Sequence, residues 1–312
     1  MALVLGSLQL GLLYGLLAMG IYITFRILNI PDLTAEGSFT FGLAVSAAFT
    51  VAGHPMVGIL FAILAGALAG AVTGFLQTGC KIHPILAGIL TMSGLYTVNL
   101  CIMGSSSNLS LIANDTLFKL SYDLFGMDKD ICKLIVSVIA IILVAAVLIV
   151  FFKTHIGLCI RATGDNEEMV KASSIDINIT KILALAISNA SIALCGGLIA
   201  QYQGFADINS GVGILVVGLA SVIIGELFTR KRSVTAGLIS AIIGSVVYRF
   251  IVALAMSTSF FPAYALKLVS AVIVGVALAI PAIKEWQATR KLKKIQKESY
   301  TRTGTAQQKG DR

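Results

Sequence analysis

The sequence predicts an all-α protein, a polytopic bundle of transmembrane helices, and three observations carry that prediction. The chain has 312 residues, 57% of them hydrophobic and only 12% charged, whereas a soluble domain carries roughly 25% charged residues. The hydrophobic residues form continuous runs, most of them about 20 residues long, which is the length of a helix that crosses a bilayer. The runs do not alternate apolar and polar residues, as the strands of a membrane β-barrel do.

Nine apolar runs lie within residues 1–283, and we expect this part of the chain to form the transmembrane domain. The runs are Leu3–Phe25, Ser38–Gly53, Met56–Leu76, Pro84–Met103, Ile131–Phe152, Ile179–Ala200, Val212–Phe228, Val234–Met256 and Tyr264–Ile283. The second run is short and rich in alanine, serine and glycine, so it is either a short span or a broken or re-entrant helix. The sequence therefore predicts eight or nine spans.

The third run carries a ridge of small residues. Gly66, Gly70 and Gly74 recur at four-residue spacing, which brings them onto one face of a helix. A small face of this kind lets two membrane helices pack closely. We therefore expect Met56–Leu76 to lie against another helix along this ridge.

The basic residues indicate how the spans are oriented. Most of the lysines and arginines that give the chain its net charge of +8 lie in Lys153–Lys181, in Arg230–Arg232 and after Lys284. The positive-inside rule places these segments in the cytoplasm, so their charge gives no reason to expect nucleic acid as a partner. Residues 284–312 are then a basic cytoplasmic tail, too short to fold alone, near anionic lipid headgroups.

Alternation along the chain predicts which connections lie on the outer side of the membrane. These connections are Gly104–Asp130, Gln201–Gly211 and Ser257–Pro262. The N-terminus lies outside if the chain has nine spans and inside if it has eight.

The sequence holds no recognisable catalytic, cofactor or metal-binding motif. It has no G-x-x-x-x-G-K-[ST] loop for nucleotide phosphates, no H-E-x-x-H and no G-x-S-x-G. The three histidines lie far apart at span ends and the five cysteines have no C-x-x-C spacing, so neither a metal site nor a disulfide framework is indicated. We expect a protein that is not itself an enzyme and needs no cofactor.

Two charged residues near the outer side are candidates for a pathway or gate through the membrane. Arg249 lies inside the run Val234–Met256. A charge in lipid costs a few kcal/mol, so Arg249 either faces the protein interior or water, or snorkels to the outer surface. Asp207 is the outer-side acid nearest to Arg249 by topology alone, and we hypothesise that the two pair.

Two acidic residues after the first run are further candidates for the same role. Asp32 and Glu36 follow Pro31. They either mark a solvated loop or cap a helix that starts near Ser38.

The segment after the fifth long run predicts a short amphipathic helix on the cytoplasmic face. Asp165 or Asn166 is suited to cap such a helix, with Glu167 and Glu168 in its first turn and Lys171 later. A helix this short and charged does not enter lipid. It either docks into a groove of a partner protein or is an ordinary interfacial loop. The candidate docking residues are Arg161, Gly164, Asp165, Asn166, Glu167, Glu168, Met169 and Lys171.

Five stretches of the chain resemble a known family. They are Gly11–Gly20, Asp32–Ser38 (which reads D-L-T-A-E-G-S), Arg161–Asn166, Ala200–Asp207 and Gly218–Glu226. The chain resembles permease subunits of bacterial ABC importers of the branched-chain amino acid and ribose permease type. It is most similar to the subgroup described as tryptophan or tyrosine transport permeases, and the similarity extends to about Lys284.

The resemblance implies a type II ABC importer permease fold in the bacterial cytoplasmic membrane. It implies a separate ATPase subunit at the cytoplasmic docking segment and an extracellular or periplasmic substrate-binding (lipo)protein at the outer face. It also implies a second permease subunit, which we expect to be identical, giving a homodimer. The expected substrate is a small solute, an aromatic or other apolar amino acid.

The sequence departs from the family pattern in two places, and one other function class stays open. Ser174 and Asp176 stand where the family often has glycine and asparagine, and Ala265 stands where an acidic residue is common near Lys267. The alternative to an importer is an ion-coupled secondary transporter or channel. That class needs ionisable residues inside the spans, and only Arg249 comes close.

Overall fold

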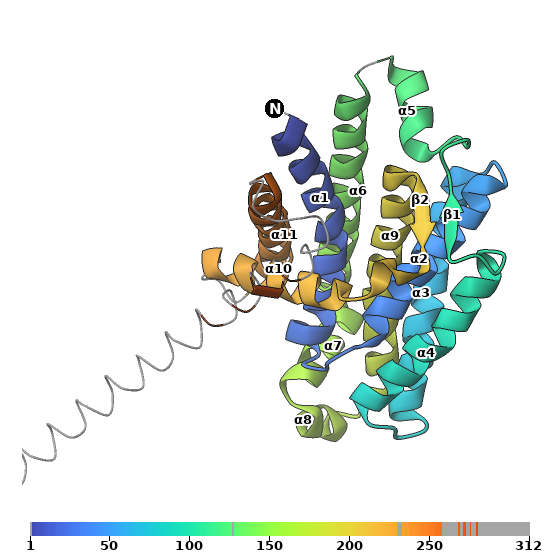
Figure 1. The fold of residues 1–312 in the computed structure, drawn as a ribbon. Helices are drawn as coiled ribbons and strands as arrows, with labels where there is room; N and C mark the ends of the chain where they lie inside the picture. The colour runs from blue at the N-terminus through green and yellow to red at the C-terminus, as the bar shows by residue number, and fades with distance from the viewer. Residues whose placement is uncertain are drawn as a thin grey trace, which may run out of the picture.

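A computed structural model describes residues 2–126, 128–229 and 233–257, with isolated helical positions between 268 and 279. It is a bundle of helices with one small sheet (Figure 1). The helices are α1 (Ala2–Tyr22), α2 (Thr34–Val51), α3 (Pro55–Thr78), α4 (Pro84–Ile102), α5 (Leu117–Phe125), α6 (Lys129–Phe151), α7 (His155–Asp165), α8 (Glu167–Ala172), α9 (Ile177–Gln203), α10 (Ile214–Phe228) and α11 (Val234–Ser257). A π-helical turn, η1 (Ile23–Ile27), follows α1, and a 3-10 turn, η2 (Ile208–Gly211), precedes α10.

Seven segments of the described chain are long and apolar enough to cross a membrane. They are Leu3–Ile27, Pro55–Thr78, Pro84–Ile102, Lys129–Phe151, Ile177–Gln203, Ile208–Phe228 and Val234–Ser257. These segments match seven of the nine predicted runs. Apart from those isolated positions, the predicted run Tyr264–Ile283 lies outside the described residues, as do Arg230–Arg232, Thr258–Pro262, Lys267 and the tail.

Helix α2 is not among these seven segments, and it runs alongside α3. Its first residue, Thr34, shares a hydroxyl hydrogen bond of 2.8 Å with Thr73 in the later part of α3. Its last residue, Val51, accepts a hydrogen bond from Asn114 in the segment before α5. The two ends of α2 therefore lie near opposite ends of α3, and the predicted run Ser38–Gly53 is part of one continuous helix rather than a broken one.

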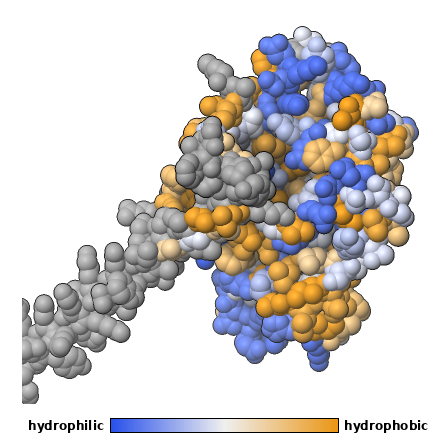
Figure 2. Space-filling model, in the orientation of Figure 1, coloured by the Kyte–Doolittle hydropathy of each residue, from blue (hydrophilic) through white to orange (hydrophobic). Residues whose placement is uncertain are grey.

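The two ends of the bundle carry different elements. The N-terminus and α5 lie at one end, and α7 and α8 lie at the other (Figure 1). Hydrophilic side chains gather at both ends in the space-filling view (Figure 2). The shared end of the N-terminus and α5 agrees with the nine-span prediction, which places the N-terminus and Gly104–Asp130 on one side.

Helix α9 forms the centre of the bundle and packs against α1, α2 and α3. The glycine ridge of α3 faces it as predicted. A Cβ built at Gly66 or Gly70 would overlap a backbone carbonyl oxygen of α9, and one at Gly74 would lie 2.7 Å from the Ile182 Cα. The contact is thus made backbone to backbone, which only the smallest residues permit.

The opposite face of α3 shows where lipid lies. Leu60, Leu64 and Leu68 repeat at four-residue spacing and are 61%, 56% and 66% exposed. A row of exposed leucines is costly in water but not in hydrocarbon. Together with the buried ridge, this row gives α3 one protein-facing side and one lipid-facing side.

The predicted connection Gly104–Asp130 contains structure that the sequence analysis did not predict. Strand β1 (Asn108–Ser110) pairs antiparallel with β2 (Phe205–Asp207), and Leu109 lies opposite Ala206. Helix α5 follows, capped by the Thr116 side chain, which accepts from the Lys119 amide at 3.2 Å. The sheet holds the connection against the segment that leads into α10.

Candidate functional site

Helix α8 is the predicted amphipathic helix. It begins at Glu167, and Asn166 is its cap, because the Asn166 side chain accepts a hydrogen bond from the Met169 amide at 3.1 Å. Asp165, the other candidate cap, is the last residue of α7. Asn166 therefore separates two helices that meet at an angle at the end of the bundle.

The two sides of α8 differ in burial and in their ion pairs. Val170 is buried against the bundle, and a Glu167–Lys181 ion pair of 2.6 Å ties the helix to α9. On the other side, Met169 and the Glu168 side chain are exposed, the latter in a 3.1 Å ion pair with Lys171. This exposed face combines an apolar side chain with charges, and is available to a partner.

The turn between α7 and α8 is attached to the connection between α1 and α2. The Asn29 side-chain amide donates to the Gly164 carbonyl oxygen at 3.0 Å. A Cβ at Gly164 would overlap the Ile27 carbonyl oxygen, so glycine is required there. Arg161 lies half-buried on α7. Sequence reasoning missed Asn29, although its left-handed backbone (φ 54°) is of the kind that asparagine tolerates.

Asp32 is buried, and the solvated-loop alternative is wrong for it. Its side chain is 4% exposed, and it accepts hydrogen bonds from the Thr34 amide at 2.9 Å and the Asn189 side-chain amide at 2.7 Å. The helix begins at Thr34 rather than near Ser38, and its N-cap residue is Leu33, so Asp32 is not the N-cap although it accepts from the first helical amide. An amide side chain from α9 makes the burial of Asp32 possible, since a buried carboxylate needs hydrogen-bond donors. Asn189, a lone amide in an apolar run, was the signal available in the sequence.

Glu36 connects the start of α2 to the start of α10. It is half-buried, and its carboxylate accepts a hydrogen bond from the Gly213 amide at 3.0 Å. A Cβ at Gly211 would overlap the Glu36 carbonyl oxygen. A negative charge at a helix N-terminus is favourable, so Glu36 holds α10 against α2.

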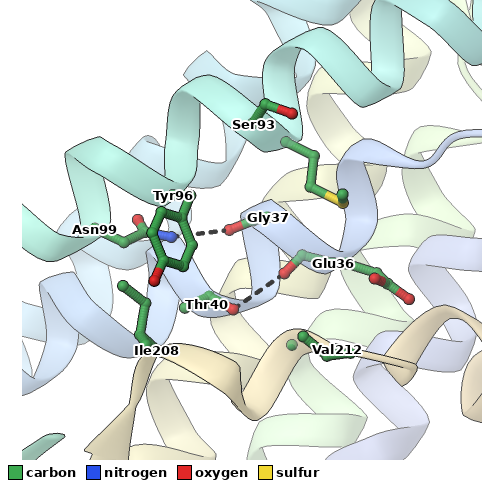
Figure 3. A pocket seen from close by; sticks show the side chains of 10 residues that line it. Glu36, Gly37, Thr40, Ser93, Tyr96, Asn99, Ile208 and Val212 are labelled. Carbon is green, nitrogen blue, oxygen red and sulfur yellow. Dashed lines mark hydrogen bonds between the residues drawn. The ribbon is translucent and has the colours of Figure 1, made fainter. Parts of the chain in front are cut away.

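A cavity of about 350 Å³ lies beside this contact, between α2, α4 and η2. It is lined by Glu36, Gly37, Thr40, Met92, Ser93, Tyr96, Asn99, Ile208, Gly211 and Val212. The Glu36 carboxylate lies towards one end of the cavity, and Tyr96 and Asn99 lie together at the other (Figure 3). Of the candidate pathway residues, Glu36 is the one that lines this cavity.

Arg249 and Asp207 are not brought together. The Arg249 guanidinium lies 3.9 Å from the centre of the buried Tyr14 ring, so Arg249 faces the protein interior. Asp207 accepts a hydrogen bond from the Asn209 amide at 2.7 Å and shapes the turn after β2. The hypothesised Asp207–Arg249 pair is not among the ion pairs of the described residues.

A further ion pair joins η1 to the end of α10. The Arg26 guanidinium in η1 pairs with the Glu226 carboxylate at the end of α10 through two of its nitrogens. Both side chains are partly exposed, at 47% and 29%. Within the part of the chain that the structure describes, no group of three histidine, cysteine, aspartate or glutamate residues could hold a metal ion.

Comparison with known proteins decides the family. A family model described as "branched-chain amino acid transport system / permease component" matches residues 3–280. The chain belongs to this permease family. A tyrosine transport system permease protein from Clostridioides difficile (strain R20291) is 39% identical to this permease over 269 residues, which cover 86% of this chain and 88% of the relative.

A more distant relative is also a permease, and a solved structure shares the fold. The autoinducer 2 import system permease protein LsrC from Yersinia enterocolitica is 26% identical over 224 residues, covering 70% of this permease and 57% of LsrC. PsaBC from Streptococcus pneumoniae, solved in complex with Fab, has a TM-score of 0.51 at 18% identity and shares the fold over 87% of this chain and 89% of that one. The protein is thus an ABC-type permease component, a multi-pass protein of the bacterial inner membrane and not an enzyme.

Proposed function

We propose that this permease couples a separate ATPase to the import of an amino acid with an aromatic or other apolar side chain. The observation that carries the proposal is the attachment of the end of α7, where it leads into α8, to the connection between η1 and α2 through Gly164 and Asn29. An exposed docking helix that is fixed to the start of a span can pass a displacement into the bundle.

The contacts define the route of that displacement. The α7–α8 turn holds Asn29, which lies three residues before Asp32. Asp32 fixes the start of α2 to Asn189 of α9, and one turn later Glu36 holds the start of α10. When the ATPase subunits close on ATP and move α8, the starts of α2 and α10 move with it. Access then alternates between the two sides.

The remaining partners follow from the two ends of the bundle. A substrate-binding protein delivers the amino acid at the end that carries α5, β1 and β2. A second, identical copy of the permease completes the pathway as a homodimer. The tyrosine transport relative supports an aromatic substrate, and it covers most of this chain.

The test is ATP-driven uptake by the permease reconstituted in proteoliposomes with its ATPase and binding protein. Gly164→Ala, whose Cβ overlaps Ile27, and Glu168→Lys, on the exposed face of α8, should each reduce uptake roughly tenfold, as expected for losing a coupling free energy near 1.4 kcal/mol. Gly94→Ala is the matched control, because nothing lies within 4 Å of its Cβ.

The outcomes separate the function classes. Uptake that needs ATP and is lost in both α8 variants supports the proposal. Uptake that runs on an ion gradient without the ATPase contradicts it and favours secondary transport. A native permease that neither retains the ATPase nor alters its rate also contradicts it.

A further inference from the structure

The cavity beside Glu36 has the size and the polarity of a small-ligand site. Its volume of about 350 Å³ lies in the range of roughly 300–1,000 Å³ typical of such sites. It combines apolar side chains with a few polar groups from three separate elements, α2, α4 and η2. Sites that fix a ligand's orientation are built in this way.

The charge of the cavity selects one kind of ligand group. Glu36 is the one acid among the ten lining residues, and none of the ten is lysine, arginine or histidine. A carboxylate offers about four acceptor positions, and the backbone amide of Gly213 uses one of them. The remaining positions suit a cationic donor such as an ammonium group.

The opposite end of the cavity suits an aromatic ring. Tyr96 is 51% exposed as a residue. Its ring lies beside Asn99, at the end away from the Glu36 carboxylate (Figure 3). Aromatic pairs contribute free energy beyond the area they bury. Met92 and Val212 add apolar surface to the cavity wall.

Asn99 supplies a polar group that the protein leaves unpaired. It is 1% exposed, yet its Oδ1 atom has no hydrogen-bond partner within the described structure. Its Nδ2 atom donates to the Gly37 carbonyl oxygen only at the long distance of 3.5 Å. A buried amide left in this state is costly, and it lies in the wall of the cavity that Asn99 lines.

We propose that this cavity is a substrate site in the permease itself, which binds the ammonium group of an aromatic amino acid at Glu36 and its ring against Tyr96. The site rests on the proposed function, because it names the substrate class of that pathway. It assigns the permease a selectivity of its own, in addition to that of the binding protein.

The test measures binding without the binding protein. The permease–ATPase complex in nanodiscs is probed by saturation-transfer NMR with L-tyrosine, tyramine and N-acetyl-L-tyrosine. The ring protons of tyrosine and tyramine, which keep the amine, should receive saturation. The signal of N-acetyl-L-tyrosine should fall roughly tenfold, the loss expected for one charge-assisted hydrogen bond.

Three variants and one control make the assignment specific. Glu36→Gln removes the charge but keeps an acceptor for the Gly213 amide, and Tyr96→Leu removes the ring. Ser93→Trp fills the cavity from an exposed position on α4, which protects the fold. Each should reduce the tyrosine signal several-fold, whereas Glu226→Gln, a carboxylate at the α8 end, should not.

Failure of this inference can be told apart from failure of the proposed function. Equal saturation of N-acetyl-L-tyrosine and tyrosine, or an unchanged signal in Ser93→Trp, overturns the site. If ATP-driven tyrosine uptake by the full complex then persists at the native rate in Ser93→Trp, the importer function stands without the site. Absence of uptake in the native complex counts against the function itself.

Discussion

The connection between η1 and α2 and the connection between α9 and α10 satisfy their polar groups in different ways. In the first, the buried Asp32 carboxylate accepts from the Thr34 amide and is itself held by the Asn189 side chain of α9. In the second, the polar groups are met by the β1–β2 pairing and the local turn at Asp207. Irregular backbone in a membrane protein needs partners from the protein. The first connection depends on one distant pair of side chains, and the second on backbone pairing between strands and a local turn.

The largest difference in stability between the two connections should appear when their carboxylates, Asp32 and Asp207, are removed. Asp32→Ala should lower the free energy of unfolding by about 3 kcal/mol, because it leaves the Thr34 N–H buried without a partner and removes one of the two hydrogen bonds of the buried Asn189 amide. Asp207→Ala should cost about 1 kcal/mol, the size of a lost cap. Chemical unfolding in detergent micelles, followed by a thiol-reactive dye, measures both.

The control for Asp32 is the double variant Asp32→Ala/Asn189→Leu. Replacing both partners by apolar groups can be nearly neutral, so the double variant should recover at least half of the loss. Equal costs for Asp32→Ala and Asp207→Ala would contradict the comparison.

A smaller effect should follow from forcing Gly211, in the connection between α9 and α10, away from the first turn of α2. A Cβ at Gly211 would overlap the Glu36 carbonyl oxygen and the Thr40 hydroxyl. Gly211→Ala should therefore destabilise the permease by about 2 kcal/mol, as overpacking does, and Gly94→Ala should not. The same unfolding measurement applies, and an unaffected Gly211→Ala would show that α10 moves freely on α2.

The smallest effect should come from the Arg26–Glu226 ion pair, which joins η1 to the end of α10. The pair is partly exposed, so Arg26→Gln should cost about 0.5 kcal/mol at low salt. The difference should shrink in about 1 M NaCl, where charges are screened within about 3 Å. A cost that is large and independent of salt would mean that the pair is desolvated in the folded protein.

The spans were predictable from sequence because lipid demands continuous apolar runs, and α8 was predictable because Asn166, Glu167 and Glu168 form a local start signal. The sequence predicted the start of α2 near Ser38 instead of Thr34. The reason is that the Asp32 carboxylate, which accepts from the Thr34 amide, is held by Asn189, far away in the chain. The cavity was not predicted as a unit, since its residues come from three elements that only the fold brings together. Helix α5 was missed because its cap, Thr116, lies in a stretch that reads as a polar loop.

The glycine ridge of α3 also limits how this protein can change shape. With the backbones of α3 and α9 in direct contact over Gly66, Gly70 and Gly74, the two helices cannot roll over each other. Sliding would have to carry the ridge to its next register, about 6 Å along the axis. The pair α3–α9 is therefore expected to move as one rigid unit.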